Sequence, residues 1–172
     1  MLSPIRLQAE DAGRRVHIGM AGDVMAPVGE SLKQFYNTGF GVSLRGQYEL
    51  SRNFALILTA GYVSFPGDPP EGATAEDGVM ITGAGGLKVL LPTGNFRFFF
   101  AFDAGYTSLE RSVQSIRSGS SFTTSTVEFT WQPQLGLEAR LGQNSSVEVS
   151  SRYVAISENE TVGLRIGILF GI

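Results

Sequence analysis

The sequence predicts an all-β fold, an eight-stranded antiparallel up-and-down transmembrane β-barrel with a polar interior. Three observations predict it. Apolar and polar residues alternate along most of the chain, which is typical of strands with one apolar face. The alternating segments are about 12 residues long, which exceeds most strands of soluble proteins and lets a tilted strand cross a bilayer. Short and long connections follow one another, as in barrels with tight turns at one end and external loops at the other.

The first four predicted strands lie near residues 15–26, 39–50, 54–65 and 78–91. The second alternates strictly, so that Val42 and Leu44 share one face while Ser43 points to the other. The third is apolar on both faces, because residues such as Ile57 stand on its nominally polar face. Those residues form either an apolar patch inside the lumen or a surface for a partner. We favour the lumen, since side chains fill the interior of an eight-stranded barrel.

The last four predicted strands lie near residues 96–107, 126–141, 146–157 and 161–172. Phe99, in the first of these, also stands on the polar face. Pro133 is unusual inside the next strand, because proline cannot donate a ladder hydrogen bond and a closed barrel has no free edge. We expect this strand either to protrude above the membrane or to begin, in effect, near Gln134. The final strand alternates strictly as far as Ile172.

The connections indicate one barrel domain, 15–172, preceded by an N-terminal extension, 1–14. Residues that favour turns form the three tight connections, at 51–53, 92–95 and 142–145. The long connections are those at 27–38, 66–77 and 108–125. With an even number of strands, both ends of the barrel domain lie on the side of the tight turns.

The distribution of charge indicates which face meets lipid. The apolar face of the eight predicted strands carries no acidic or basic residue, and a lipid-facing Arg or Lys near the bilayer centre costs about 2–4 kcal/mol. The polar face carries nearly equal numbers of positive and negative groups, as expected where charges share a narrow lumen and need partners. The predicted polar network of the lumen consists of Asp23, Arg45, Glu49, Lys88, Arg97, Asp103, Glu128, Glu138, Arg140, Glu148, Arg152 and Arg165.

Aromatic residues of the apolar face gather near both ends of the strands, as in the two girdles that lie at the bilayer interfaces. The alternative is that aromatic residues simply favour strands and barrel cores. We favour the girdles. The predicted girdle residues are Phe40, Tyr48, Phe54, Tyr62, Phe96, Tyr106, Phe129, Trp131, Tyr153 and Phe170.

Over residues 15–172 the chain resembles the small eight-stranded outer-membrane β-barrels of the OmpA/OmpX type. The resemblance rests on the strand pattern and on a closing strand similar to the carboxy-terminal assembly signal of those proteins. That family usually ends in an aromatic residue, whereas this chain ends in Ile172, with Phe170 two positions earlier. The resemblance implies a place in the outer membrane of a Gram-negative cell envelope, with outer-membrane lipid and the barrel assembly machinery as partners. Residues 1–15 contain no apolar core of an export signal.

Motifs that carry chemistry are scarce. The chain has no Cys, which excludes disulfides and thiolate metal sites. Its one histidine, His17, falls on the polar face, where we expect a polar network and no catalysis, since a catalyst needs an arranged partner. Phosphate-loop, zinc-protease and EF-hand motifs are absent from the sequence, and a net charge of -3 calls for no nucleic-acid partner. We therefore expect no enzyme activity, no cofactor and no metal.

From this sequence we expect a membrane scaffold that presents its loops for adhesion, envelope integrity or surface recognition. An extracellular partner would bind through loops 27–38, 66–77 and 108–125. Two alternatives stay open. A narrow porin-like channel would line a water path with the same charges, and a soluble lipocalin-like carrier would turn its apolar face inward around an apolar ligand.

Overall fold

The computed structural model describes residues 16–68, 73–75, 77–115, 121–142, 144–157 and 159–172. The predicted N-terminal extension, 1–14, and Arg15 at the start of the predicted barrel domain lie outside these residues. The described elements are β1 (Val16–Pro27), α1 (Glu30–Lys33), β2 (Gly39–Glu49), β3 (Phe54–Phe65), β4 (Ala73–Ala75), β5 (Gly78–Thr93), β6 (Phe96–Ser115), β7 (Ser121–Arg140), β8 (Ser145–Ile156) and β9 (Asn159–Gly171).

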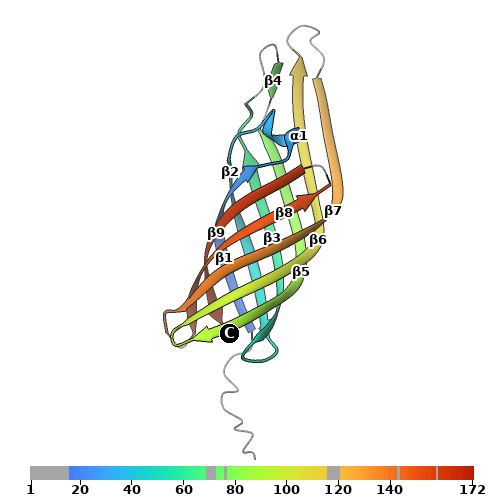
Figure 1. Cartoon of the computed structure of the whole chain (residues 1–172). Helices are drawn as coiled ribbons and strands as arrows, with labels where there is room; N and C mark the ends of the chain where they lie inside the picture. The colour runs from blue at the N-terminus through green and yellow to red at the C-terminus, as the bar shows by residue number, and fades with distance from the viewer. Residues whose placement is uncertain (1–15, 69–72, 76, 116–120, 143, 158) are drawn as a thin grey trace, which may run out of the picture.

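The eight long strands form a closed antiparallel barrel (Figure 1). Each long strand pairs with the next along the chain, and β1 pairs with β9 to close the wall. The register keeps apolar residues in common rows; Val24 of β1, for example, pairs with Phe40 of β2 and Leu164 of β9. Because side chains alternate with a period of two, this register gathers the apolar rows on one surface. The predicted fold class is thereby confirmed.

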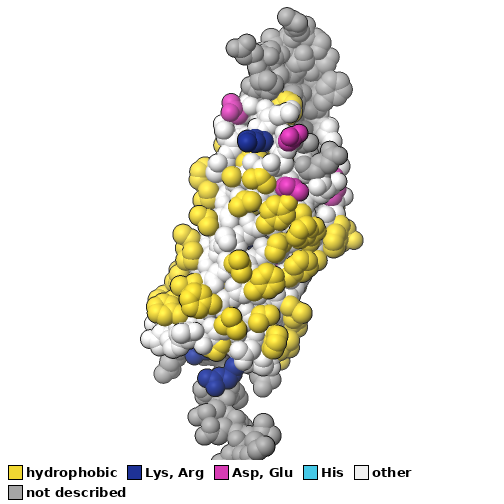
Figure 2. Space-filling view, in the orientation of Figure 1, with side chains coloured by type: hydrophobic (Ala, Val, Ile, Leu, Met, Phe, Trp, Pro, Cys, Tyr) yellow, Lys and Arg dark blue, Asp and Glu magenta, His cyan; other side chains and the backbone are white. Residues whose placement is uncertain are grey.

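The apolar surface of the wall points outward. Leu44 of β2 exposes 61% of its area, whereas its neighbour Arg45 exposes only 5%. Apolar side chains cover the wall in Figure 2, and the charged side chains visible in that view lie toward its two ends. A soluble carrier needs the opposite arrangement, so the lipocalin-like alternative is wrong.

The external end of the barrel is more regular than the sequence predicts. α1 forms inside the connection 27–38, and β4 forms inside the connection 66–77. β6 and β7 extend beyond the predicted strands by pairing with each other as far as Gln114–Ser121, and β4 pairs with the outer part of β6. These strands rise above the rest of the barrel in Figure 1. The Thr-rich part of β7 favours a strand because β-branched side chains fit a pleated surface.

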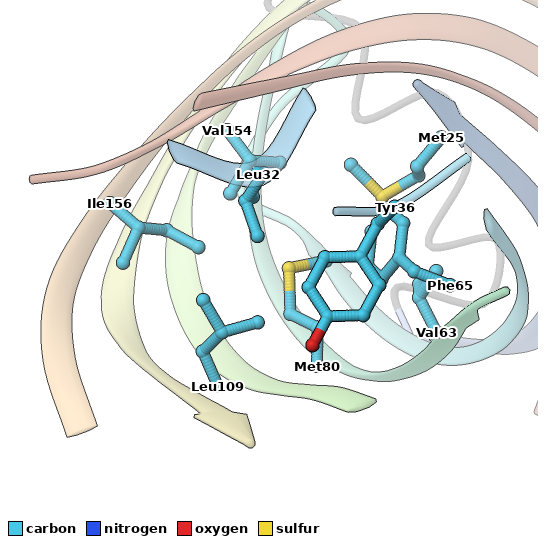
Figure 3. Close-up of a cluster of buried hydrophobic side chains, with 9 residues drawn as sticks. All are labelled: Met25, Leu32, Tyr36, Val63, Phe65, Met80, Leu109, Val154 and Ile156. Carbon is cyan, nitrogen blue, oxygen red and sulfur yellow. The ribbon is translucent and has the colours of Figure 1, made fainter. Parts of the chain in front are cut away.

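Apolar side chains close the external end of the lumen. Leu32 of α1 and Tyr36, just after it, fold inward and pack against inner residues of the wall (Figure 3). The backbone N–H groups of Val28 and Gly29 donate to the carbonyl oxygen of Glu160, which ties this segment to β9. We call the cluster the external plug, and it comprises Met25, Leu32, Tyr36, Val63, Phe65, Met80, Leu109, Val154 and Ile156.

A second apolar cluster fills the lumen beside β3, β5 and β6. Its members are Ala55, Ile57, Leu90, Phe99 and Ala101. Phe99 lies over Gly136, where an added Cβ would come within 2.5 Å of the Phe99 ring, so only glycine leaves room for the ring. The residues that make β3 apolar on both faces thus fill the lumen.

The sixth predicted strand, β7, runs through Pro133 and does not begin near Gln134. Its ladder to β6 includes the pair Phe102–Pro133, whereas its ladder to β8 resumes only at Gln134 after a last pair at Trp131. Proline has no N–H to donate. The ladder of β7 is therefore interrupted toward β8 and continuous toward β6.

Candidate functional site: the charged lumen and the external rim

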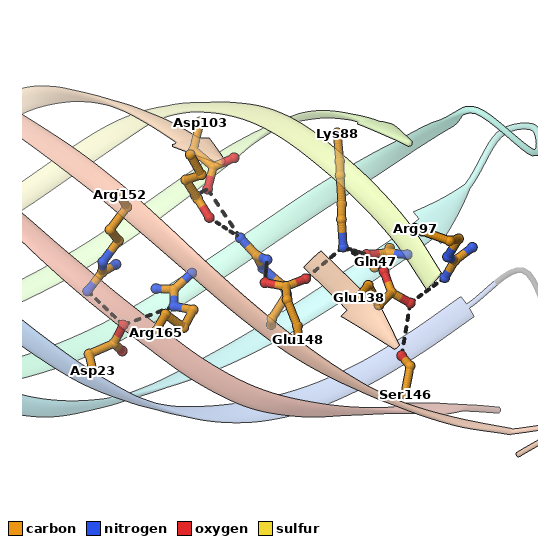
Figure 4. A network of polar contacts seen from close by, with 12 residues as sticks. Asp23, Gln47, Lys88, Arg97, Asp103, Glu138, Ser146, Glu148, Arg152 and Arg165 are labelled. Atoms are coloured by element: carbon orange, nitrogen blue, oxygen red, sulfur yellow. Dashed lines mark hydrogen bonds and ion pairs between the residues drawn. The ribbon is translucent and has the colours of Figure 1, made fainter. Parts of the chain in front are cut away.

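A chain of ion pairs runs along the lumen (Figure 4). We call it the lumen network, and it joins Arg45, Lys88, Arg97, Arg152 and Arg165 to Asp23, Glu49, Asp103, Glu138 and Glu148. Nine of these ten side chains are buried, and Glu49 is half-buried. They come from every long strand except β3, whose inner face is largely apolar.

Lys88 joins two carboxylates at the centre of the lumen network. Its Nζ lies 2.6 Å from Glu148 Oε2, 2.9 Å from Glu138 Oε2 and 3.0 Å from Gln47 Oε1. The same atom lies 4.1 Å from the centroid of the Phe99 ring, within the range of a cation–π contact. Because Lys88 is fully buried, these contacts replace the water that its ammonium group loses on folding.

The network continues toward the tight-turn end through Arg97. Its Nη1 donates to Glu49 Oε1 at 2.6 Å, and its Nη2 donates to Glu138. The Ser146 hydroxyl donates to the same Glu138 carboxylate at 2.9 Å. His17 Nε2 lies 3.5 Å from Glu49 Oε1, so the single histidine stands at this end of the lumen network.

Arg45 extends the lumen network toward the middle of the barrel. It donates to Glu148 through Nη1 and to Gln134 Oε1 through Nη2, the latter at 2.7 Å. Gln134 Nε2 in turn donates to Asp103 Oδ2 at 2.6 Å, and Arg45 Nη2 lies 4.0 Å from the same oxygen. Gln134 therefore links Arg45 to the carboxylate of Asp103.

Two arginines share one carboxylate below the external plug. Arg165 Nε donates to Asp23 Oδ1 at 2.9 Å, and Arg152 Nη2 lies 3.0 Å from that oxygen. Arg152 also contacts the Met25 sulfur, a member of the external plug, at 3.0 Å. The ionic and apolar parts of the lumen therefore meet directly.

The lumen network is electrically balanced, with five cations and five carboxylates. Each charge that leaves water on folding needs a partner of opposite sign, because an unpaired buried charge costs several kcal/mol. Pairing across strands distant in sequence also cross-links the barrel from within; Arg45 and Glu148 are 103 residues apart. The role of this arrangement is structural, since it holds the strands together from inside the barrel.

Two residues predicted for the lumen network lie elsewhere. Glu128 is half-buried on the part of β7 that extends past its ladder with β8, and Arg140 is exposed at the opposite end of that strand. Both have the parity of the inner face. Glu128, however, has no described β8 residue beside it, and Arg140 is exposed at the tight-turn end, so parity alone does not tell which inner-face residues join the lumen network.

The predicted girdle aromatics lie on the outer surface. Tyr153 is half-exposed and the other nine are exposed. Toward the external end, Tyr106 packs edge-on against Phe129 with ring centroids 5.9 Å apart, and Trp131 lies 5.6 Å from Tyr153. Contacts between aromatic rings at this level suit a membrane interface, where amphipathic rings are stable.

Sequence reasoning missed Gln47, Gln134 and Ser146, which complete the hydrogen bonds of the lumen network. Their parity on the polar face was the available signal. It also missed the inward turn of the segment with Leu32 and Tyr36, because a four-residue helix has no periodic pattern of its own.

Within the described ranges, no group of three or more His, Cys, Asp or Glu residues is arranged to hold a metal ion. None of the described helices has the length and apolar character that crossing a membrane requires.

These features together define a transmembrane β-barrel, with an apolar outer wall, aromatic residues toward both ends and a self-neutralised charged interior. The chain belongs to the outer membrane protein beta-barrel domain family, whose model matches residues 4–168. That membership confirms the resemblance in the sequence and gives the protein its place in the bacterial outer membrane. No curated protein matches the chain.

Solved structures share the fold. The attachment invasion locus protein Ail of Yersinia pestis aligns with a TM-score of 0.63 at 14% identity, over 91% of this chain and 96% of that one. OprG of Pseudomonas aeruginosa aligns with a TM-score of 0.65 at 14% identity, over 93% and 97%. Neisserial surface protein A aligns with a TM-score of 0.64 at 11% identity, over 91% and 97%.

Proposed function

We propose that this outer-membrane barrel is a non-enzymatic scaffold that presents an external β-sheet to an extracellular partner. The observation that carries the proposal is the extension of β6 and β7, with β4 at its side, above a lumen filled by the external plug and the lumen network. A sheet raised above the membrane serves recognition, whereas a filled lumen does not serve passage.

The similar structures support a role at the cell surface through the shared fold alone. One of them is named as an attachment invasion locus protein, and a second structure of that protein contains the heparin analogue sucrose octasulfate. Those descriptions belong to the Yersinia pestis protein. For the present chain, the support comes from the form of its own external end.

The open edge of β7 is the part of the raised sheet best suited to a partner. β8 pairs with β7 only from Trp131 onward, while β6 pairs with the other side of β7 along its whole length. From Thr124 to Thr130, no described strand pairs with this second edge of β7. An open strand edge pairs readily with an extended chain, and this segment has no Lys or Pro to discourage it. The partner we propose is therefore an extended polypeptide segment.

Strand geometry tells which amides face the open edge. The ladder skips Pro133 on the β8 side, so the missing N–H is one that would have pointed that way. N–H groups alternate sides along a strand. The N–H groups of Val127 and Phe129 therefore face the open edge, and those of Thr126 and Glu128 face β6.

Amide hydrogen exchange checks this assignment. In detergent micelles the amides of Thr126 and Glu128 are expected to exchange about tenfold more slowly than those of Val127 and Phe129, since a factor of ten equals about 1.4 kcal/mol, near the worth of one hydrogen bond. Equal protection of all four amides would show that the edge is covered and would remove the basis for strand addition.

A peptide library displayed on phage, selected against the barrel in nanodiscs, tests the partner. Selected peptides are expected to bind the wild type and the Val127→Ala variant, which keeps the amide, and to lose binding to Val127→Pro, which removes it. Peptides that bind Val127→Pro as well as Val127→Ala would show that recognition does not use this backbone edge.

Planar-bilayer recording separates the scaffold from the porin-like alternative. Purified protein is expected to give no steady conductance steps, because ion pairs and the external plug fill the lumen. A channel-forming porin added afterwards to the same bilayer serves as the control for detection. Reproducible unitary steps from this protein would instead favour the channel.

A further inference from the structure

The outer wall is hollowed where β7 meets β8. A cavity of about 240 Å³ lies beside Pro133, at the place where the ladder between these strands is interrupted. Its outer lining consists of Phe100, Leu135, Ser151, Tyr153 and Val162. Pro133, Gln134 and Arg152 complete the lining, and the side chains of Gln134 and Arg152 are themselves buried.

Two local features produce this hollow, which we call the wall groove. Pro133 has no N–H for β8, and the two strands therefore lack their pairs at this level. Ser151 is the smallest of the outward residues here; it pairs with Leu135 on one side and Leu164 on the other, and its short side chain leaves the space between them open.

The level of the wall groove within the bilayer determines what can occupy it. Leu135 exposes 61% of its area and Leu164 exposes 59%, and both belong to the apolar wall. Trp131 and Tyr153 of the external girdle lie at the external margin of the groove, two residues beyond Pro133 and Ser151 on their strands. The groove therefore opens into the hydrocarbon just beneath the external interface, where acyl chains are the surrounding medium.

We infer that the wall groove binds part of an acyl chain of a membrane lipid. Pockets for whole small molecules measure about 300–1,000 Å³, so a cavity of about 240 Å³ suits a segment of a chain whose remainder stays in the bilayer. Its mainly apolar outer lining offers dispersion contacts, which drive association inside a membrane where the hydrophobic effect is absent. A bound acyl chain also covers the backbone groups at the interrupted ladder, because the bilayer offers these groups no hydrogen bonds.

Native mass spectrometry of the whole protein, with dipalmitoyl phosphatidylethanolamine added in detergent, tests this inference. The wild type is expected to retain a lipid adduct. Ser151→Phe fills the groove from outside, and Pro133→Thr restores the missing N–H; both variants are expected to lose the adduct. Ala60→Phe is the matched control, because Ala60 is also small and outward on the opposite part of the wall, and it is expected to keep the adduct.

Fluorescence of Trp131, the single tryptophan, provides a second measurement that needs no detergent. In bilayers with brominated acyl chains, quenching of Trp131 is expected to fall in Ser151→Phe and to stay at the wild-type level in Ala60→Phe. Retention of the adduct by both groove variants, or its absence from the wild type, would overturn the inference. A third outcome would also overturn it: equal lipid retention by all four proteins, together with entry of apolar solutes into the lumen through the groove. The groove would then be a passage.

Discussion

Replacement of Lys88 by Met is expected to destabilise the folded barrel by about 3–5 kcal/mol, the cost of breaking a buried ion pair by removing one partner. Lys88 is the cation that Glu138 and Glu148 share, at 2.9 Å and 2.6 Å. Without it, the two carboxylates, which are paired neighbours on β7 and β8, lie side by side in the lumen, and the otherwise neutral network carries a net charge of -1. Urea titration of the protein in phospholipid vesicles, followed by Trp131 fluorescence, measures the free energy of unfolding.

Two further variants show whether charge pairing is the cause. Lys33→Met removes an exposed lysine of α1 and is expected to change the free energy of unfolding by less than about 0.5 kcal/mol. The double variant Lys88→Met with Glu148→Gln restores neutrality, so it is expected to be more stable than Lys88→Met alone. A double variant no more stable than the single one would show that Lys88 acts through packing and not through its charge.

Leu164→Arg is expected to cost about 2–4 kcal/mol and to prevent assembly of much of the protein, because it places a charge on the lipid-facing wall. Leu164 exposes 59% of its area between Val24 and Ser151. The shift in gel mobility between unboiled and boiled samples measures the folded fraction. Val127→Arg is the control on the raised part of β7, where the outward side chain meets water and the folded fraction is expected to stay unchanged. An unaffected Leu164→Arg protein would contradict the assignment of the lipid-facing surface.

Gly163→Arg, at the neighbouring position, is expected to fail for a different reason. A Cβ at Gly163 would lie 2.7 Å from the Val24 carbonyl oxygen and 2.9 Å from Met25 Cγ, so the wall itself would have to move. The new cation would also stand beside Arg152, its partner in the ladder with β8. Gly163→Ala separates the two causes, since it keeps the steric conflict without the charge. The same assay of gel mobility then shows how much of the loss remains in the Ala variant.

The residues of the lumen network illustrate the reach of pattern reasoning. Parity along each strand is a local property, and it assigns Asp23 or Glu148 to the inner face without any knowledge of neighbours. Depth is not local. Glu128 and Arg140 share the parity of the network but lie outside it, because Glu128 stands where β7 has passed its ladder with β8 and Arg140 lies at the opposite, exposed end of the strand.

The sequence by itself determined the closed all-β architecture, the outward apolar face and the charge balance inside, because each follows from a period of two and from the cost of a charge in lipid. The tertiary structure alone decided which cation meets which carboxylate, how Leu32 and Tyr36 close the lumen, and where the wall opens beside Pro133. Those features depend on the stagger between strands and on contacts between residues far apart in the chain, such as Arg45 and Glu148. Neither is encoded in any single segment.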